Sequence, residues 1–133
     1  MFQFLPQLLL DERLRKLRLA TALTLFAIIL VIGSIPGARA EIGNLASGVV
    51  LHSVAYGGLT LLLFTGLEGK RSERAFKAVL IVMAMGAADE TIQALLPYRV
   101  GALLDWMVDS IAAIVTAGLA WRFLPQPVLA RRA

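Results

Sequence analysis

Long apolar stretches, separated by short polar connections, dominate the chain. Four of them cover residues 19–36, 45–66, 76–96 and 102–124, each close to the about 20 residues that a helix needs to cross a bilayer. Runs such as LTLFAIILVIG and AVLIVMAMGAA show no alternation of polar and apolar positions, so they do not fit strands of a membrane β-barrel. GSIPGARAE imitates a signal-peptide cleavage site, but we interpret the first stretch as a retained span. The pattern predicts an all-α membrane protein, a four-transmembrane-helix bundle.

The segments between the predicted helices are short. Pro36 and Pro97 end the first and third spans, and short connections make consecutive helices antiparallel neighbours. We therefore expect a single domain over residues 1–133. Residues 1–18 are predicted to form a cytoplasmic or interfacial segment, and residues 125–133 a cytoplasmic tail.

Basic residues are distributed unevenly between the two sides of the predicted bundle. The sequence is 59% hydrophobic, with 13 lysines and arginines and a formal net charge of +4. Cytoplasmic loops carry the excess of such residues, and only Arg39 and Arg99 fall on the opposite side. Both termini are thus predicted to be cytoplasmic in an inner membrane. Because topology accounts for these charges and no aromatic-basic motif accompanies them, we expect no nucleic-acid partner.

A group of polar residues interrupts the apolar pattern in the outer half of the predicted bundle. Within ADETIQALLPYRVGALLD, residues 88–105, acids, a glutamine and an arginine occur together. The polar residues come from the second, third and fourth predicted helices and from the turn between the third and the fourth. Within one helix, residues one turn apart share a face. We expect Glu90, Gln93 and Gly86 to point inward and Asp89 to point away. The candidate ligand-binding residues are His52, Tyr56, Glu90, Gln93, Arg99, Asp105 and Asp109.

Two interpretations of this polar group stay open. It can be a hydrogen-bonded plug that holds three helices together, with Arg99 pairing with Asp105 or Glu90 and Tyr56 donating to a carboxylate. It can also be a functional site, because charged residues within a membrane are functional candidates by default. Four acids face one arginine and one histidine, and this surplus of negative charge favours a functional site. The inner half, by contrast, reads as almost purely apolar.

No metal or cofactor is expected. The chain has no cysteine, which excludes disulfides and thiolate metal sites. His52, Glu90, Asp105 and Asp109 offer donors for a divalent cation, but no spacing such as H-E-x-x-H supports that site. No serine-centred nucleophile motif is present either. A lone histidine is as readily a packed side chain as an acid, base or ligand, so both roles remain open for His52.

The stretches HSVAY and DETIQALLPYRVGALLDWMVD resemble the VanZ-like membrane proteins. That family pattern has a histidine, then Asp-Glu-x-x-Gln, an arginine after a short turn and an aspartate in the next helix. The residues that match are His52, Glu90, Gln93, Arg99 and Asp105, within roughly residues 45–120. Asp109 departs from the pattern, because the family usually has asparagine there. The resemblance implies a group named for raised resistance to the glycopeptide teicoplanin, with many members in other envelope contexts.

Three hypotheses of function follow. The first is a cell-envelope protein that binds a polar headgroup or amine-bearing ligand, with Arg99 holding an anionic part and the carboxylates a cationic part. The second is an enzyme acting on lipid-linked substrates, with Glu90 or His52 as general acid or base and Asp105 orienting it. The third is an accessory subunit whose small-residue helix faces contact a membrane partner or a second copy of the chain. The expected partners are membrane lipids and an envelope lipid or glycopeptide-related ligand.

Overall fold

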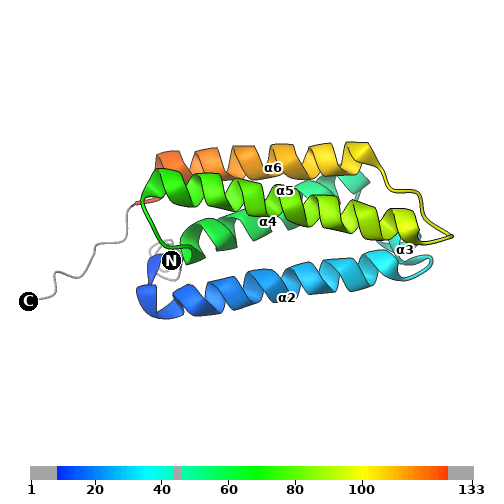
Figure 1. The fold of residues 1–133 in the computed structure, drawn as a ribbon, viewed down its shortest axis with the longest axis horizontal. Helices are drawn as coiled ribbons and strands as arrows, with labels where there is room; N and C mark the ends of the chain where they lie inside the picture. The colour runs from blue at the N-terminus through cyan, green and yellow to red at the C-terminus, as the bar shows by residue number, and fades with distance from the viewer. Residues whose placement is uncertain (1–8, 44–45, 126–133) are drawn as a thin grey trace, which may run out of the picture.

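The computed structural model describes residues 9–43 and 46–125, and within them every regular element is a helix (Figure 1). Four of these helices are long and apolar enough to cross a membrane, which confirms the predicted four-helix bundle. Most of the predicted tail and the first part of the predicted interfacial segment, residues 126–133 and 1–8, lie outside the described residues. In chain order the elements are η1 (Glu12–Leu14), α2 (Arg15–Ser34), α3 (Ala38–Gly43), α4 (Gly48–Gly66), α5 (Arg71–Leu95) and α6 (Leu103–Phe123).

The helix boundaries have local causes in the sequence. Proline disfavours a helical conformation in the residue before it. Accordingly, Ile35 and Leu96 are extended, and α2 and α5 end just before Pro36 and Pro97. At its other end α5 begins earlier than the apolar stretch indicates, at Arg71, because the Glu73 side chain accepts a hydrogen bond of 3.2 Å from the Lys70 N–H. Hydropathy locates the buried length of a helix but not its polar ends, and it gave no signal for the short helix α3.

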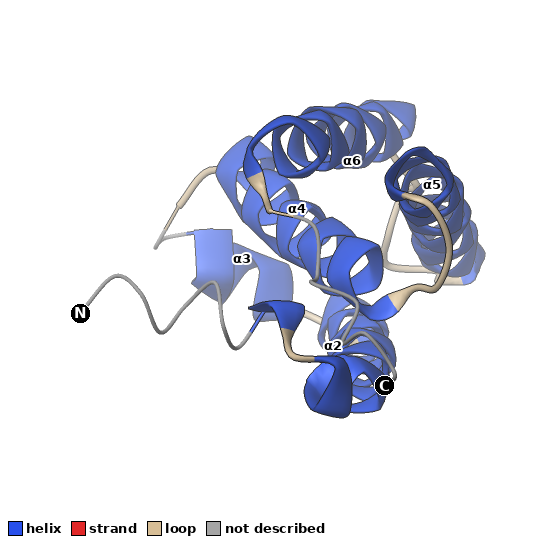
Figure 2. Cartoon of the chain, turned by 90° about the vertical axis from the view of Figure 1, so that its left-hand side faces the viewer, coloured by secondary structure: helices blue, strands red, loops and turns tan. Residues whose placement is uncertain are grey.

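The helix α4 has the central position in the bundle. Viewed along the bundle, it lies between α2 and α6, with α5 at the side of α6 (Figure 2). α6 packs extensively on both α4 and α5, whereas α2 packs mainly on α4 and less on α5. This arrangement places polar residues of α4 within reach of both α5 and α6.

Small residues allow α6 to approach its neighbours closely, as in many membrane helix pairs. Ala113 and Ala117 are buried, and a Cβ at Gly57 of α4 would lie 3.1 Å from Thr116 Oγ1. These positions agree with the role that their size predicts. Three other small residues, Gly58 of α4 and Ala84 and Ala88 of α5, are exposed and do not contribute to this packing.

Large apolar side chains cover the outside of the bundle. Val31, Val54, Leu80 and Leu119, one on each long helix, are all about half exposed or more. In water such a surface would be strongly unfavourable. Lipid chains are as apolar as these side chains, so the surface is the one expected for a bundle surrounded by lipid.

Two buried arginines lie at the end of the bundle where α2 and α5 begin. Arg18 and Arg74 are 7% and 6% exposed. Arg18 donates to the backbone oxygens of Thr65 and Asp11, each at 2.9 Å, and the Arg74 guanidinium lies 5.0 Å from the centre of the Phe64 ring. Both arginines precede the apolar stretches predicted at residues 19–36 and 76–96. Basic residues that the topology rule counts as loop charges are packed into the bundle.

Candidate functional site

The central helix α4 supplies two aromatic side chains to the polar group. His52 and Tyr56 are one turn apart, and their rings stack with centroids 5.9 Å apart and planes within 3° of parallel. Tyr56 is buried and His52 is partly buried. Because α5 and α6 flank α4, one ring reaches each of these helices.

Asp89 is at the centre of the hydrogen bonds between α4 and α5. Its Oδ2 accepts from Tyr56 Oη at 2.9 Å, and its Oδ1 accepts from Gln93 Nε2 at 2.8 Å. Asp89 is 2% exposed and Gln93 is 3% exposed. The expected hydrogen bond from Tyr56 to a carboxylate is present, but the expectation that Asp89 points away from the polar group is wrong. Asp89 and Gln93 are four residues apart and share the inward face of α5.

The histidine is held by two aspartates of α6. His52 Nδ1 lies 2.8 Å from Asp109 Oδ1, and His52 Nε2 lies 3.8 Å from Asp105 Oδ2. Asp109 is fully buried, and its Oδ2 has no hydrogen-bond partner among the described residues. A Cβ at Gly86 of α5 would lie only 3.0 Å from that oxygen. The Asp105 and Asp109 side chains therefore share one face of α6, as their spacing predicts.

Glu90 lies beside the polar group and binds the backbone where α6 begins. Its Oε2 accepts a hydrogen bond of 2.5 Å from the Ala102 N–H, and its Oε1 has no partner within residues 9–43 and 46–125. Glycine is required close by, because a Cβ at Gly101 would lie 2.8 Å from the Glu90 backbone oxygen. Of the stripe expected to point inward, Gly86 and Gln93 are buried, whereas Glu90 is only partly buried.

Arg99 has a different partner from those expected. It is in the turn between α5 and α6, and its Nη2 donates to Gln93 Oε1. In the part of the chain that the structure describes, it forms no salt bridge with Glu90 or Asp105. The arginine thus joins the network through a neutral amide, and Gln93 connects it to Asp89.

A cavity of about 330 Å³ adjoins this network between α2, α4 and α5. Five of its lining residues are polar and belong to the polar group described above. Most of the other lining residues are apolar and come from α2 and α4, such as Ile29 and Leu51. The wall formed by α2 approaches closely, because a Cβ at Gly33 would lie 3.4 Å from Gln93 Nε2. The polar lining residues are His52, Tyr56, Asp89, Gln93 and Arg99.

The cavity changes which residues belong to the candidate site. Glu90, Asp105 and Asp109 do not line it, although they were predicted to bind ligand; the two aspartates contact His52, which does line it. Sequence reasoning missed Asp89 and the wall contributed by α2. Asp89 and Glu90 are four and three residues from Gln93, so their spacing alone does not choose between them, and no motif on α2 indicated its wall of the cavity. No three His, Cys, Asp or Glu side chains are grouped to hold a metal ion within the described ranges.

The arrangement defines a multi-pass membrane protein with a partly polar cavity at one end of its bundle. This chain belongs to the VanZ/LLP1 family, whose sequence model matches residues 2–124, nearly the whole chain. The resemblance carried by the histidine, the Asp-Glu-x-x-Gln motif, the arginine and the aspartate is confirmed. No curated protein and no solved structure matches the chain.

Proposed function

We propose that the cavity binds the headgroup of a membrane lipid or lipid-like ligand that carries both an anionic group and an amine. The observation that carries this proposal is the composition of the cavity wall. Its lining combines five charged or polar side chains with apolar residues that come mostly from α2 and α4. Ligand sites in proteins commonly combine an apolar wall with a few convergent polar groups. A headgroup with part of its chain matches such a wall.

The charges favour a zwitterionic headgroup over a purely anionic one. Arg99 supplies a positive guanidinium at the cavity, while Asp89 supplies a carboxylate in the same wall. A phosphate alone would be attracted by Arg99 and repelled by Asp89 and by the two aspartates behind His52. An amine on the same ligand reverses that repulsion. Phosphatidylethanolamine, which has a phosphate and an ammonium, is the simplest probe of this chemistry.

The test compares phosphatidylethanolamine with phosphatidylglycerol of the same acyl chains, added to the purified protein in detergent. We expect the amine-bearing lipid to raise Tm more. Asp89→Asn, which removes the carboxylate from the cavity wall, should abolish the difference between the two lipids. Glu41→Gln makes the same chemical change on the exposed face of α3, outside the cavity lining, and should retain the difference.

The proposal fails if both lipids raise Tm equally in the unaltered protein. It also fails if the preference for phosphatidylethanolamine survives in Asp89→Asn, whatever the result for Arg99→Gln. Loss of one hydrogen-bonded charge pair should weaken lipid binding by about tenfold or more.

A second candidate function, an enzyme acting on lipid-linked substrates, is favoured by the contact between His52 and Asp109. An aspartate bound to one ring nitrogen orients a histidine and fixes its tautomer, as general acid–base catalysis requires. His52 also lines the cavity. Incubation with lipid-linked envelope substrates, followed by mass analysis of the lipids, tests this function. A product formed by the unaltered protein and not by His52→Gln would support it, and unchanged lipid in both would exclude it for those substrates.

The cellular setting is proposed from the sequence. We infer an inner-membrane protein of the cell envelope with both termini in the cytoplasm, because basic residues are concentrated at the end where α2 and α5 begin. A reporter enzyme that is active only in the cytoplasm, fused after residue 133, should be active. The resemblance to VanZ-like proteins makes teicoplanin susceptibility the phenotype to measure first. Expression in a susceptible bacterium should raise its resistance if this member acts in that context.

A further inference from the structure

We propose that the opposite end of the bundle holds a second site, which binds the phosphate of an anionic phospholipid. The site is a basic depression between the start of α5 and the end of α6. It is independent of the cavity near His52, because no lining residue is common to the two. The proposal therefore stands or falls separately from the proposed headgroup cavity.

The depression has a volume of about 600 Å³ and a positive lining. α5 and the residue before it contribute Lys70, Arg71 and Ser72, and α6 contributes Trp121 and Arg122. Three of these five side chains are cationic, one is a hydroxyl and one is an indole, and none is acidic. Basic pockets between membrane helices are the usual setting for anionic lipid headgroups.

Arg71 donates hydrogen bonds to carbonyl groups beside this site that would otherwise repel an anion. Its Nη2 donates to the backbone oxygens of Ala120, at 3.3 Å, and of Leu124. These are terminal carbonyls of α6, and the C-terminal end of a helix is electrostatically negative. With Nη2 bound to them, the guanidinium offsets that negative end and fixes the side chain at the wall of the depression.

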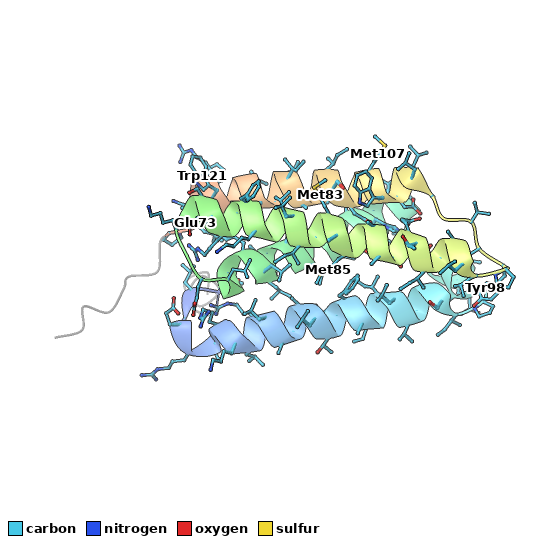
Figure 3. All side chains as sticks on the ribbon, in the orientation of Figure 1. Glu73, Met83, Met85, Tyr98, Met107 and Trp121 are labelled. Atoms are coloured by element: carbon cyan, nitrogen blue, oxygen red, sulfur yellow. The ribbon has the colours of Figure 1, made fainter. Side chains whose placement is uncertain are left out.

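The nearest acid on α5 does not cancel the positive charge. Glu73 is at the same end of the bundle as Trp121 (Figure 3), its Oε2 accepts from the Lys70 N–H, and Glu73 is not part of the lining. Glu68, in the connection between α4 and α5, pairs with Arg15 of α2 instead. The lining therefore keeps a net positive charge.

The surroundings indicate a lipid as the source of the phosphate. Trp121 is 49% exposed, and indoles prefer the boundary between headgroups and hydrocarbon. On the same face of α6, seven residues before Trp121, Ile114 is 56% exposed. A phospholipid can place its phosphate in the depression while its acyl chains follow this apolar surface of α6. A free phosphate would make no use of that surface.

The test measures phospholipid retained by the full-length protein in detergent, by native mass spectrometry, with phosphatidylglycerol or phosphatidylcholine added. The test variant is the double substitution Lys70→Gln and Arg122→Gln, because both side chains are exposed and their loss should not disturb folding. The control is Lys16→Gln with Lys77→Gln, which removes the same charge from exposed positions near the same end, outside the depression. Tm is measured for both variants to confirm that they are folded.

We expect the unaltered protein to retain phosphatidylglycerol in preference to phosphatidylcholine. The test variant should bind it at least about tenfold more weakly, and the control should remain within about twofold. Equal weakening in both variants would overturn the proposal, since net charge alone would then explain retention. Equal retention of both lipids would also overturn it. Saturation of the site by inorganic phosphate alone, with displacement of the lipid, would contradict a lipid as its occupant.

Discussion

Buried carboxylates at one end of this bundle bind other side chains, whereas buried arginines at the opposite end bind the backbone or an aromatic ring. Asp89 accepts from Tyr56 and Gln93, and Asp109 contacts His52. Arg18 donates to the oxygens of Thr65 and Asp11. Both ends of the bundle bury charged side chains, but the partners of these side chains differ.

This difference in partners indicates that the buried arginines have a structural role and the buried carboxylates a functional one. Helix ends leave carbonyl groups without partners, and an arginine that binds them stabilises the ends of two helices at once. At the carboxylate end, by contrast, Asp109 and Glu90 each keep one buried oxygen without a partner among the described residues, and a cavity adjoins the network. A cluster selected only for stability would not need surplus acids or the cavity. This contrast supports the proposed ligand binding at the carboxylate end, and it gives the buried Arg18 and Arg74 a structural role that is separate from the exposed basic depression at their end of the bundle.

The largest effect should come from filling the contact between α5 and α6 at the carboxylate end. In Gly86→Val, the new side chain would meet Asp109 Oδ2 and Trp106 Cδ1, which lie 3.0 and 3.2 Å from the position of its Cβ. We expect a loss of about 2–3 kcal/mol of stability through overpacking, measured by unfolding in detergent. Gly58→Val is the matched control on α4, where a Cβ meets nothing within 4 Å. Equal losses in both would show that helix propensity, and not the contact with Asp109, is responsible.

A smaller loss is expected at the arginine end. Arg18→Gln removes the donor to Thr65 and Asp11, and hydrogen bonds that involve a charged group contribute about 1.5–3 kcal/mol. We expect a loss of about 2 kcal/mol, measured by the same unfolding experiment. Lys16→Gln, an exposed change on the same helix, should leave stability unchanged. If Arg18→Gln were equally neutral, the arginine end would not have the structural role assigned to it.

The smallest effect is expected for Glu90→Gln. The amide keeps an oxygen that can accept from the Ala102 N–H, while the charge disappears from a position where the other carboxylate oxygen has no partner among the described residues. Stability should change by less than about 0.5 kcal/mol, because the capping interaction is retained. Glu90→Leu removes the acceptor and should be clearly less stable than Glu90→Gln. Equal stability of these two variants would show that the contact with Ala102 does not matter.

The sequence predicted the number of spans and the residues of the polar group, but not the orientation of every side chain. Hydropathy detects a membrane helix because all its faces are apolar. For the same reason, it does not show which face of α5 is turned inward. We assigned the inward face of α5 to the side that carries Glu90, whereas the buried residues include Val82, Met85 and Asp89. Only the packing of α5 on α4 and α6 decides between Asp89 and Glu90.

The burial of the arginines was missed for a related reason. The distribution of basic residues predicts the side of the membrane on which a helix end lies, and it contains no information on burial. Arg18 and Arg74 satisfy that rule and are nevertheless packed between helices. Long side chains can place their charge at the end of a bundle while their stems are covered by neighbours. The contribution of α2 to the cavity also depends on this tertiary packing.

The most direct test of the contrast between the two ends is the Tm of Asp109→Asn, measured in detergent beside Arg18→Gln. Asparagine keeps an oxygen for His52 Nδ1 and removes a buried charge whose second oxygen has no partner among the described residues. If the carboxylate end is maintained for binding at some loss of stability, Asp109→Asn should leave Tm unchanged or raise it, while Arg18→Gln lowers it. A fall in Tm for Asp109→Asn as large as that for Arg18→Gln would contradict the account. The carboxylates would then serve mainly to hold the helices together.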